Sequence, residues 1–246
     1  MHPMLFRLGP LHFYSYGLLI AVGFLAASAL AVRRAAAVGI DPASIQNIGL
    51  TALLAGLSGG RLAYVLLRWE LYRGHPFEIL RLDHGGLVFY GGLAAGLPAA
   101  LWVIRRAGLP VLRTVDLLVP PLTVAHAFGR VGCFLNGCCY GKPTLLPWGV
   151  RFPGEEFRRH PVQLYETAFL FLLFFVLSKI ASSQSRFKPG ALFLVYGVAY
   201  GIWRFLAEFL RADNPPIALG LTVFQWISLP VVAVAGALLW LRYSSK

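Results

Sequence analysis

Three arginines lie within or at the edge of long apolar stretches of the sequence: Arg61, Arg130 and Arg204. A charged side chain at the centre of a membrane-spanning helix costs at least about 2.5–3.5 kcal/mol, so such residues usually have a partner or a function. A guanidinium offers a planar fork of N–H donors that suits a phosphate group. The alternative for any one of them is a long side chain that reaches the membrane surface from the end of a span.

Arg204 belongs to a polar stripe in an apolar segment. With 100° per residue, the stripe covers an arc of about 80° on one helix face, and it comprises Tyr200, Arg204, Glu208 and Arg211. Two interpretations stay open. The stripe is either an internal ion pair that holds helices together or one wall of a polar cavity, in which Glu208 orients Arg204.

The segment 129–137, with the sequence GRVGCFLNG, combines Arg130 with Asn136 among three glycines. Glycine allows the backbone to approach a bulky polar group closely, and Arg with Asn near a membrane surface suits a phospholipid headgroup. The alternative is a glycine-rich packing turn in which Asn136 caps a helix.

Two further polar segments are ambiguous. The glycine pairs 85–86 and 91–92 bracket a short run ending at Tyr90, and they indicate either a tight helix crossing or a substrate groove. Residues 159–166 (RHPVQLYE) include His160, and Pro161 suits the first turn of a helix. On physical grounds capping is favoured for that segment.

The cysteines, Cys133, Cys138 and Cys139, are three in number and clustered. They are too few for a disulfide framework. With His126 they supply four potential zinc ligands, but adjacent cysteines rarely both reach one zinc and the spacing fits no standard zinc motif. The sequence therefore predicts no metal and no other cofactor, and it favours small buried residues or an oxidisable pair.

The composition is that of a membrane protein. Of 246 residues, 58% are hydrophobic and 13% are charged, and the mean hydropathy is +0.68. A soluble domain has about 25% charged residues, so a soluble globular protein and a disordered chain are both excluded. The net charge of +12 suggests nucleic acid in a soluble protein, but in an apolar chain it is typical of cytoplasmic loops. No nucleic-acid partner is expected.

Seven stretches are long enough to span a bilayer, which needs about 20 apolar residues. They lie near 13–32, 45–67, 85–104, 115–136, 163–181, 190–210 and 221–241. The sequence thus predicts an all-α integral membrane protein, a bundle of about seven transmembrane helices forming one polytopic domain over 1–246. The fourth stretch contains Pro120 and Pro121, so a broken or re-entrant helix is possible there.

The distribution of charge predicts the orientation. Segments after spans one, three and five and the C-terminus hold ten Lys or Arg and one acid, whereas the opposite side holds nine with six acids in longer loops. The orientation follows the density of Lys and Arg in short loops, which is higher on the first side. We expect the N-terminus outside and the C-terminus in the cytoplasm, with two longer loops, 68–84 and 137–162, on the outer face.

Together these motifs resemble the phosphatidylglycerol–prolipoprotein diacylglyceryl transferase family over nearly the whole chain. The resemblance rests on these ordered blocks: 14–18 (YSYGL), 59–64 (GGRLAY), 129–137, 140–144 (YGKPT), 147–153 (PWGVRFP), 159–166, and the stripe from Tyr200 to Arg211. Such enzymes of the bacterial inner membrane move the diacylglyceryl group of phosphatidylglycerol to the lipobox cysteine of a prolipoprotein signal peptide and release glycerol phosphate.

The resemblance also implies a set of site residues. The catalytic set is Arg130, Arg204, Tyr90 and Glu208, with both arginines facing the phosphate and Glu208 supporting Arg204. The substrate-binding set is Arg130 with six further residues: Tyr16, Arg61, Asn136, Gly141, His160 and Tyr200.

This chain departs from the family pattern at three positions. Cys133 and Cys138 stand where the family usually has Asn and an acidic residue, and Tyr90 stands where it commonly has His. Tyr90, with an ordinary pKa of about 10, is a poor thiol base. The phenol then serves as a hydrogen-bonding group, or His160, Glu208 or no base at all acts on the thiol.

Two other functions compete with the transferase. The departures motivate a non-catalytic relative that binds or moves phospholipid, and the intramembrane arginines alone motivate an anion channel or transporter.

Overall fold

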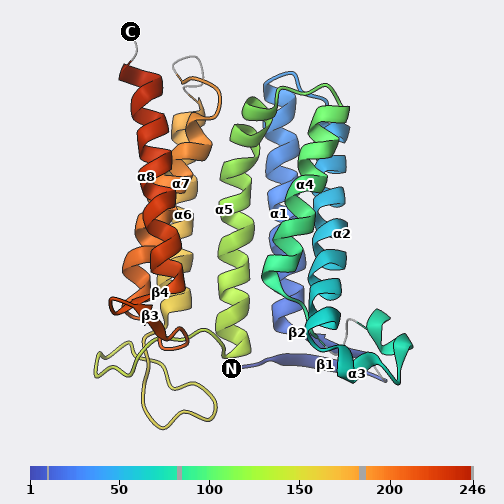
Figure 1. Ribbon diagram of the computed structural model, residues 1–246, viewed down its shortest axis with the longest axis vertical. Coiled ribbons are helices and arrows are strands. Elements are labelled where there is room, and N and C mark those ends of the chain that lie inside the picture. Colours follow the sequence, from blue (N-terminus) through green and yellow to red (C-terminus); the bar gives the residue numbers. More distant parts are fainter. Residues whose placement is uncertain (10, 82–84, 183–186, 245–246) are drawn as a thin grey trace. The chain divides into compact units, whose positions relative to one another are not determined.

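The computed structural model describes residues 1–246 apart from 10, 82–84, 183–186 and 245–246. Helices dominate the described chain, together with two short antiparallel hairpins, as Figure 1 shows. The chain forms two compact units. Unit 1 comprises residues 1–27 and 115–246, and unit 2 comprises residues 28–114. The prediction of an all-α membrane protein is confirmed, whereas the single polytopic domain stays a prediction.

The long helices correspond to the expected spans: α1 Ser15–Ala37, α2 Pro42–Leu67, α4 Phe89–Arg106, α5 Val111–Asn136, α6 Val162–Ser182, α7 Ala191–Glu208 and α8 Val223–Ser244. Within the described residues, six of them are long and apolar enough to cross a membrane. The exception is α4. It has 18 residues, and Arg105 and Arg106 at its end lower its hydropathy below that of the other six.

Unit 2 is built on a close crossing of α2 and α4. A Cβ placed on Gly59 would lie 2.6 Å from the carbonyl oxygen of Gly91, and a Cβ on Gly91 would lie 2.6 Å from the oxygen of Gly59. The two backbones therefore touch at positions where neither helix carries a side chain. The interpretation of the second glycine pair as a tight crossing is confirmed.

Two short helices follow α2 in unit 2: α3 Trp69–Tyr72 and the 3₁₀ helix η1 Pro76–Leu80. At its other end α2 is capped by Asp41, whose carboxylate accepts the N–H groups of Ala43 and Ser44 at 3.2 and 3.0 Å. Pro42 occupies the first turn, where a missing N–H costs nothing. This cap fixes the start of α2.

Unit 1 packs α5, α6 and α7 around an apolar core, and α8 packs against α7. Val119 of α5 and Leu173 and Leu177 of α6 are buried together, and Val195 of α7 packs against them. Helices of one chain that bury such faces against each other hold the polar residues between them in fixed positions.

The helix α5 is continuous through Pro120 and Pro121, so the broken or re-entrant helix considered from the sequence is wrong. Each proline removes one backbone N–H donor. One turn on, the hydroxyl of Thr123 donates to the carbonyl of Pro120 at 2.7 Å.

A buried carboxylate joins α5 to α7. Asp116 of α5 accepts the backbone N–H of Gly190 at 2.6 Å and that of Phe193 at 3.0 Å. Gly190 is the N-cap of α7 and has a φ of 90°, which favours glycine. Asp116 thus caps a helix that is distant in the sequence, and a negative charge at a helix N-terminus is stabilising.

The loop 137–161 is tied to its surroundings by backbone hydrogen bonds. The N–H of Gly141 donates to His160 at 2.9 Å, and that of Lys142 donates to Leu210 at 2.7 Å. Phe152, within the loop, is buried. Two hairpins, which the sequence did not predict, complete unit 1: β1 Met4–Leu8 with β2 Leu11–Tyr14, and β3 Pro216–Ala218 with β4 Leu221–Thr222.

Candidate active site

Glu166, on the second turn of α6, is the centre of a polar cluster in unit 1. Its side chain is fully buried. Nη2 of Arg130 lies 2.6 Å from Oε2 of Glu166, and the hydroxyl of Tyr200 donates to Oε1 at 2.8 Å. Nε2 of His126 lies 3.5 Å from the same Oε1. Three helices, α5, α6 and α7, therefore converge on one carboxylate.

The spacing of the residues explains this convergence. His126 and Arg130 are four residues apart on α5, so they lie on the same face of that helix. The ring of Tyr200 meets the ring of His126 edge to face at 5.2 Å and stacks on Tyr196 at 5.7 Å. Aromatic contacts of this kind fix the side chains around Glu166.

A second buried carboxylate, Glu208, holds Arg204. Nη2 of Arg204 lies 3.0 Å from Oε2 of Glu208, and the Arg204 guanidinium lies over the ring of Phe224 at 4.3 Å. Thr222 donates to Oε1 of Glu208 at 3.0 Å, and Asn214 donates to it at 2.5 Å. The predicted support of Arg204 by Glu208 is present in the structure.

The residues of the stripe predicted on α7 contact two different carboxylates, Glu166 and Glu208. Tyr200 bonds to Glu166, whereas Arg204 bonds to Glu208. Arg211 lies beyond the end of α7 and forms its shorter contact with Asp213, at 2.5 Å. Arg204 and Glu208 lie four residues apart on α7, so their ion pair does not join two helices, and the two interpretations of the stripe both stay open.

Both arginines keep unused hydrogen-bond donors. Nε of Arg130 and Nη1 of Arg204 are buried, and neither has a hydrogen-bond partner within the described part of the chain. A buried N–H without a partner costs free energy, and an anion with oxygen acceptors satisfies it. The pair is thus suited to binding a phosphate.

Gly141 and His160 anchor the loop 137–161 beside the end of α7. A Cβ on Gly141 would lie 2.7 Å from both the Cβ of His160 and the carbonyl oxygen of Leu210. Only glycine permits this approach. Nδ1 of His160 lies 3.3 Å from the hydroxyl of Tyr165, which also accepts a hydrogen bond from Trp148 at 2.8 Å.

Tyr16 and Asn136 lie near the end of α5. Tyr16 packs over Gly132, where a Cβ would meet its Cδ2 atom at 3.0 Å. Asn136 is the last residue of α5 and is exposed. The three cysteine sulfurs lie within 4.8 Å of one another at the same place. The spacing of the cysteines in the sequence did not predict that their sulfur atoms lie so close together.

A surface cluster stiffens the loop. Tyr140 donates to Glu155, and Nη2 of Arg159 lies 2.5 Å from the other oxygen of Glu155. The hydrogen bonds from Tyr140 and Arg159 hold the pKa of Glu155 below its ordinary value. The same bond to Glu155 raises the pKa of Tyr140, because the carboxylate favours the protonated phenol.

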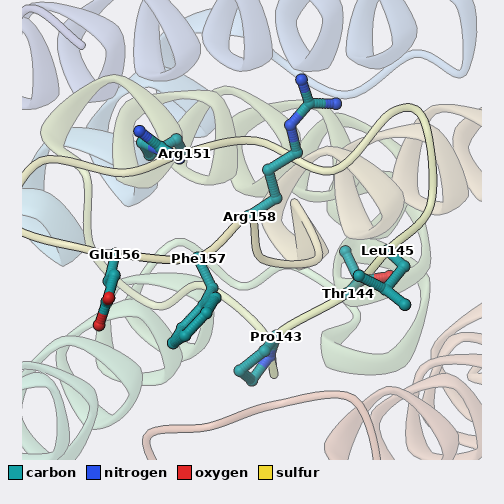
Figure 2. Close-up of a pocket in the computed structure, with 7 residues that line it drawn as sticks. All are labelled: Pro143, Thr144, Leu145, Arg151, Glu156, Phe157 and Arg158. Carbon is teal, nitrogen blue, oxygen red and sulfur yellow. The ribbon is translucent and has the colours of Figure 1, made fainter.

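Two of the cavities among the described residues of unit 1 bear on the site. The larger, about 460 Å³, is in the loop, and Figure 2 shows the residues that line it: Pro143, Thr144, Leu145, Arg151, Glu156, Phe157 and Arg158. The second, about 350 Å³, includes Lys142, Glu208 and Arg211 in its lining. The second cavity therefore reaches the carboxylate that holds Arg204.

Arg61 and Tyr90 belong to unit 2. The N–H groups of Arg61 donate to five backbone carbonyls at 2.6–3.1 Å, those of Glu78, Ile79, Arg81, Gly85 and Gly86. A guanidinium has five N–H donors, so Arg61 is saturated by its own loop, which the sequence did not predict. Tyr90, on the first turn of α4, is half exposed.

Glu166 and His126 are the residues that the predicted site set lacked. Glu166 was visible as a lone acid inside an otherwise apolar span, which is a signal in itself. Its partner was not visible, because Arg130 and Glu166 are 36 positions apart on different helices.

Comparisons with known proteins show the family to which the chain belongs. A family profile described as prolipoprotein diacylglyceryl transferase matches residues 3–241. A Clostridium tetani protein named phosphatidylglycerol–prolipoprotein diacylglyceryl transferase is 38% identical over 239 residues, which cover 95% of each chain. A Coxiella burnetii protein of the same name is 36% identical, covering 99% of this chain and 96% of its own. The protein therefore belongs to the prolipoprotein diacylglyceryl transferase family.

Proposed function

We propose that this enzyme transfers the diacylglyceryl group of phosphatidylglycerol to the thiol of a prolipoprotein cysteine and releases glycerol phosphate. It is a transferase of the bacterial inner membrane with several membrane-spanning helices. The finer assignments of topology, partner and site residues are part of the same proposal.

The observation that carries the proposal is the pair of buried arginines with unused donors. Arg130 and Arg204 are each held by one carboxylate, and each keeps an N–H without a partner among the described residues. The phosphodiester carries one negative charge, and glycerol phosphate leaves with a second. Donors preorganised around that developing charge lower the barrier.

The carboxylates set the geometry of these arginines. Glu166 orients Arg130, and Glu208 orients Arg204, so that neither guanidinium must reorganise when the phosphate arrives. Tyr200 acts through Glu166, to which its hydroxyl donates. We assign these three residues to positioning rather than to contact with the reacting atoms.

The remaining site residues have distinct proposed roles. Tyr16 and Asn136 line the phosphate site at the end of α5, and His160 and Gly141 define its loop wall. Tyr90 is proposed as a hydrogen-bonding group for the substrate. Arg61, in contrast, positions the loop of unit 2, because its donors are already used.

The protein partner is a prolipoprotein signal peptide with its lipobox cysteine. The N-terminus lies outside and the C-terminus lies in the cytoplasm, so that the loop 137–161 faces the outer side. The charge distribution along the sequence supports this orientation.

The test is direct conversion. Purified protein in micelles containing phosphatidylglycerol is incubated with a lipobox peptide, and the diacylglyceryl thioether is detected by mass spectrometry. A peptide with Ser in place of the lipobox Cys is the matched control and should remain unmodified. Lipid binding by a well-folded sample without any thioether would favour the non-catalytic relative instead.

A further inference from the structure

The carboxylate of Glu208, which holds Arg204, is itself held by two uncharged donors from the segment after α7. The hydroxyl of Thr222 donates to Oε1 at 3.0 Å, and the side-chain amide of Asn214 donates to the same oxygen at 2.5 Å. A carboxylate oxygen has about two lone-pair sites, so these two donors fill Oε1. The other oxygen, Oε2, is the one that faces Arg204.

This division of the carboxylate decides how Arg204 contacts it. Arginine and a carboxylate frequently form two parallel hydrogen bonds, one to each oxygen. Here Nη2 lies 3.0 Å from Oε2 of Glu208, whereas Nη1 is buried and has no partner within the described part of the chain. Because Oε1 is already filled, Nη1 stays available to an anion.

The hairpin of β3 and β4 brings both donors to the same carboxylate. Leu219 and Gly220 form its turn, with φ values of 49° and 72°. Positive φ at both central residues is typical of a two-residue type I′ turn. Pro216 pairs with Thr222 across the hairpin, and Asn214 stands two residues before Pro216. The two donors therefore come from one short, closed segment.

Thr222 directly precedes α8 and forms a capping box with Gln225. The hydroxyl oxygen of Thr222 accepts the N–H of Gln225 at 3.4 Å, and Oε1 of Gln225 accepts the N–H of Thr222 at 3.0 Å. An ionised carboxylate only accepts hydrogen bonds, so the hydroxyl proton points to Glu208. The amide of Gln225 also donates to the carbonyl of Phe205 on α7 at 3.3 Å. The start of α8 is thereby fixed beside Arg204.

The first turn of α8 contacts the guanidinium as well. Arg204 lies over the ring of Phe224 at 4.3 Å, and Phe224 is two residues after Thr222. A cation over an aromatic face is attracted by the ring without using an N–H donor. One helix turn therefore holds the carboxylate through Thr222 and the guanidinium through Phe224.

The carboxylate of Glu166 is arranged in the same way. Its Oε1 accepts the hydroxyl of Tyr200 at 2.8 Å and faces His126 at 3.5 Å, whereas its Oε2 faces Arg130. Arg130 likewise keeps one buried N–H without a partner among the described residues. In both pairs one carboxylate oxygen holds the arginine and the other is occupied by different side chains. This repetition is explained by a common need for an unused arginine donor.

We propose that Thr222, together with Asn214, is a positioning residue for the transfer reaction. By filling Oε1 of Glu208, the two donors confine Arg204 to Oε2 and keep Nη1 for the phosphate of phosphatidylglycerol. This inference rests on the proposed function. Without the hydroxyl of Thr222, Oε1 regains an open acceptor site, and Arg204 closes onto both oxygens at the expense of the phosphate.

The first experiment removes each donor separately. Thr222→Val deletes the hydroxyl at nearly constant volume, and Asn214→Ala deletes the amide. Each should lower kcat for conversion of the lipobox peptide by at least about 10-fold, which is less than the 10²–10³ typical for loss of a donor to the reacting group itself. Thr222→Ser keeps the hydroxyl and should retain the wild-type kcat. Loss of kcat in Thr222→Ser equal to that in Thr222→Val contradicts the role of the hydroxyl.

Thr222→Val also removes a helix cap, which by itself lowers stability. Asp41→Ala removes the side-chain cap of α2 in unit 2 and is the matched control. It should lower the melting temperature and leave kcat unchanged. If kcat falls as far in Asp41→Ala as in Thr222→Val, general destabilisation explains the loss and the positioning role is overturned.

A double-mutant cycle with Arg204 separates positioning from a purely structural role. A residue that acts through the guanidinium has nothing to position once the guanidinium is gone. Thr222→Val should therefore lower kcat in the wild-type background and change it little in Arg204→Lys protein. An equal fold-loss in both backgrounds overturns the inference. Asn214→Ala leaves the cap of α8 intact, so it carries the same cycle if Thr222→Val fails to fold.

Lipid binding without the peptide separates this inference from the proposed function. Phosphatidylglycerol, measured by native mass spectrometry in a neutral detergent, should bind Thr222→Val about 10-fold more weakly than Thr222→Ser, because one hydrogen bond to a charged group is lost. Normal kcat and normal binding in Thr222→Val overturn the inference and leave the transferase intact. Weaker binding in Thr222→Val, with no conversion by the wild-type protein, means that the positioning role stands and the proposed function fails.

Discussion

Arg130 of α5 and Glu166 of α6 form an ion pair in which Nη2 lies 2.6 Å from Oε2. The carboxylate is fully buried and also receives the hydroxyl of Tyr200. Burying two charges is costly, and a buried pair often adds little net stability. Its presence between two membrane helices is better explained by a requirement for Arg130 in one orientation.

Replacing Glu166 tests that requirement. Glu166→Gln keeps the size of the side chain but leaves the charge of Arg130 unpaired, which costs about 3–5 kcal/mol when one partner of a buried pair is removed. We expect a lower melting temperature in detergent and at least about 100-fold slower conversion. Glu156→Gln, at an exposed loop position, is the control. Unchanged kcat/KM in a folded Glu166→Gln protein would contradict the positioning role.

The arginines themselves should account for much of the rate. Arg130→Ala and Arg204→Ala each remove donors to the leaving phosphate, and loss of one such donor typically costs about 10²–10³ in kcat. Lysine should restore only part of this, because it lacks the planar fork. The exposed Arg151→Ala is the matched control. A larger loss of kcat in Arg151→Ala than in Arg130→Ala would indicate that the phosphate site lies in the loop instead.

Arg61 should matter for stability rather than for substrate affinity. Arg61→Lys retains the charge but offers three donors where five carbonyls are bonded. At least two of the five hydrogen bonds are therefore lost, and each contributes about 0.5–1.5 kcal/mol net, so the melting temperature should fall. Arg105→Lys, at the exposed end of α4, should change it little. A stable Arg61→Lys protein with a raised KM for phosphatidylglycerol would instead return Arg61 to the substrate site.

The crossing of α2 and α4 should not tolerate a methyl group. In Gly59→Ala the new Cβ would meet the oxygen of Gly91 at 2.6 Å, and such overpacking costs about 1–3 kcal/mol. Gly236→Ala in α8 is the contrasting helix position, because nothing lies within 4 Å of its Cβ. It should stabilise the protein by up to about 1 kcal/mol. Thermal unfolding of the two variants checks both signs.

The cluster of Tyr140, Glu155 and Arg159 predicts that the stability of the loop 137–161 depends on pH. Since the pKa of Glu155 is lowered in the fold, its contribution to stability is complete above the unfolded value of about 4.3 and is lost as the pH falls through the lowered pKa. Since the pKa of Tyr140 is raised, its contribution is complete below about 10 and is lost as the pH rises through the raised pKa.

Hydrogen–deuterium exchange of the loop 137–161 measures this dependence. Protection, corrected for the intrinsic exchange rate, should fall at both acid and alkaline extremes. Glu155→Gln should remove the acid limb and leave the melting of α5 to α8 unchanged. An acid limb that persists in this variant would mean that another group controls the loop.

The sequence predicted contacts within one helix better than contacts between helices. Arg204 and Glu208 are four residues apart, so helical periodicity alone placed them together. Arg130 with Glu166 depends on how α5 packs on α6, and no local pattern encodes that. The carbonyls around Arg61 and the turn at Cys139 depend on loop conformation, which is likewise invisible to periodicity. Hydropathy identified the helices, because length and apolar content are summed over many residues.

The cap formed by Asp116 fixes how far along α5 and α7 the two arginines of the proposed phosphate site lie. Arg130 follows Asp116 by 14 residues, and Arg204 follows Gly190, the residue that Asp116 caps, by 14 residues as well. Both α5 and α7 run away from that cap in the same direction (Figure 1), and 14 residues of helix rise about 21 Å. Tying the two helices at one end therefore brings both guanidiniums to the same depth in the membrane. A one-residue insertion in either helix between cap and arginine would offset the charges vertically and rotate one of them by about 100°.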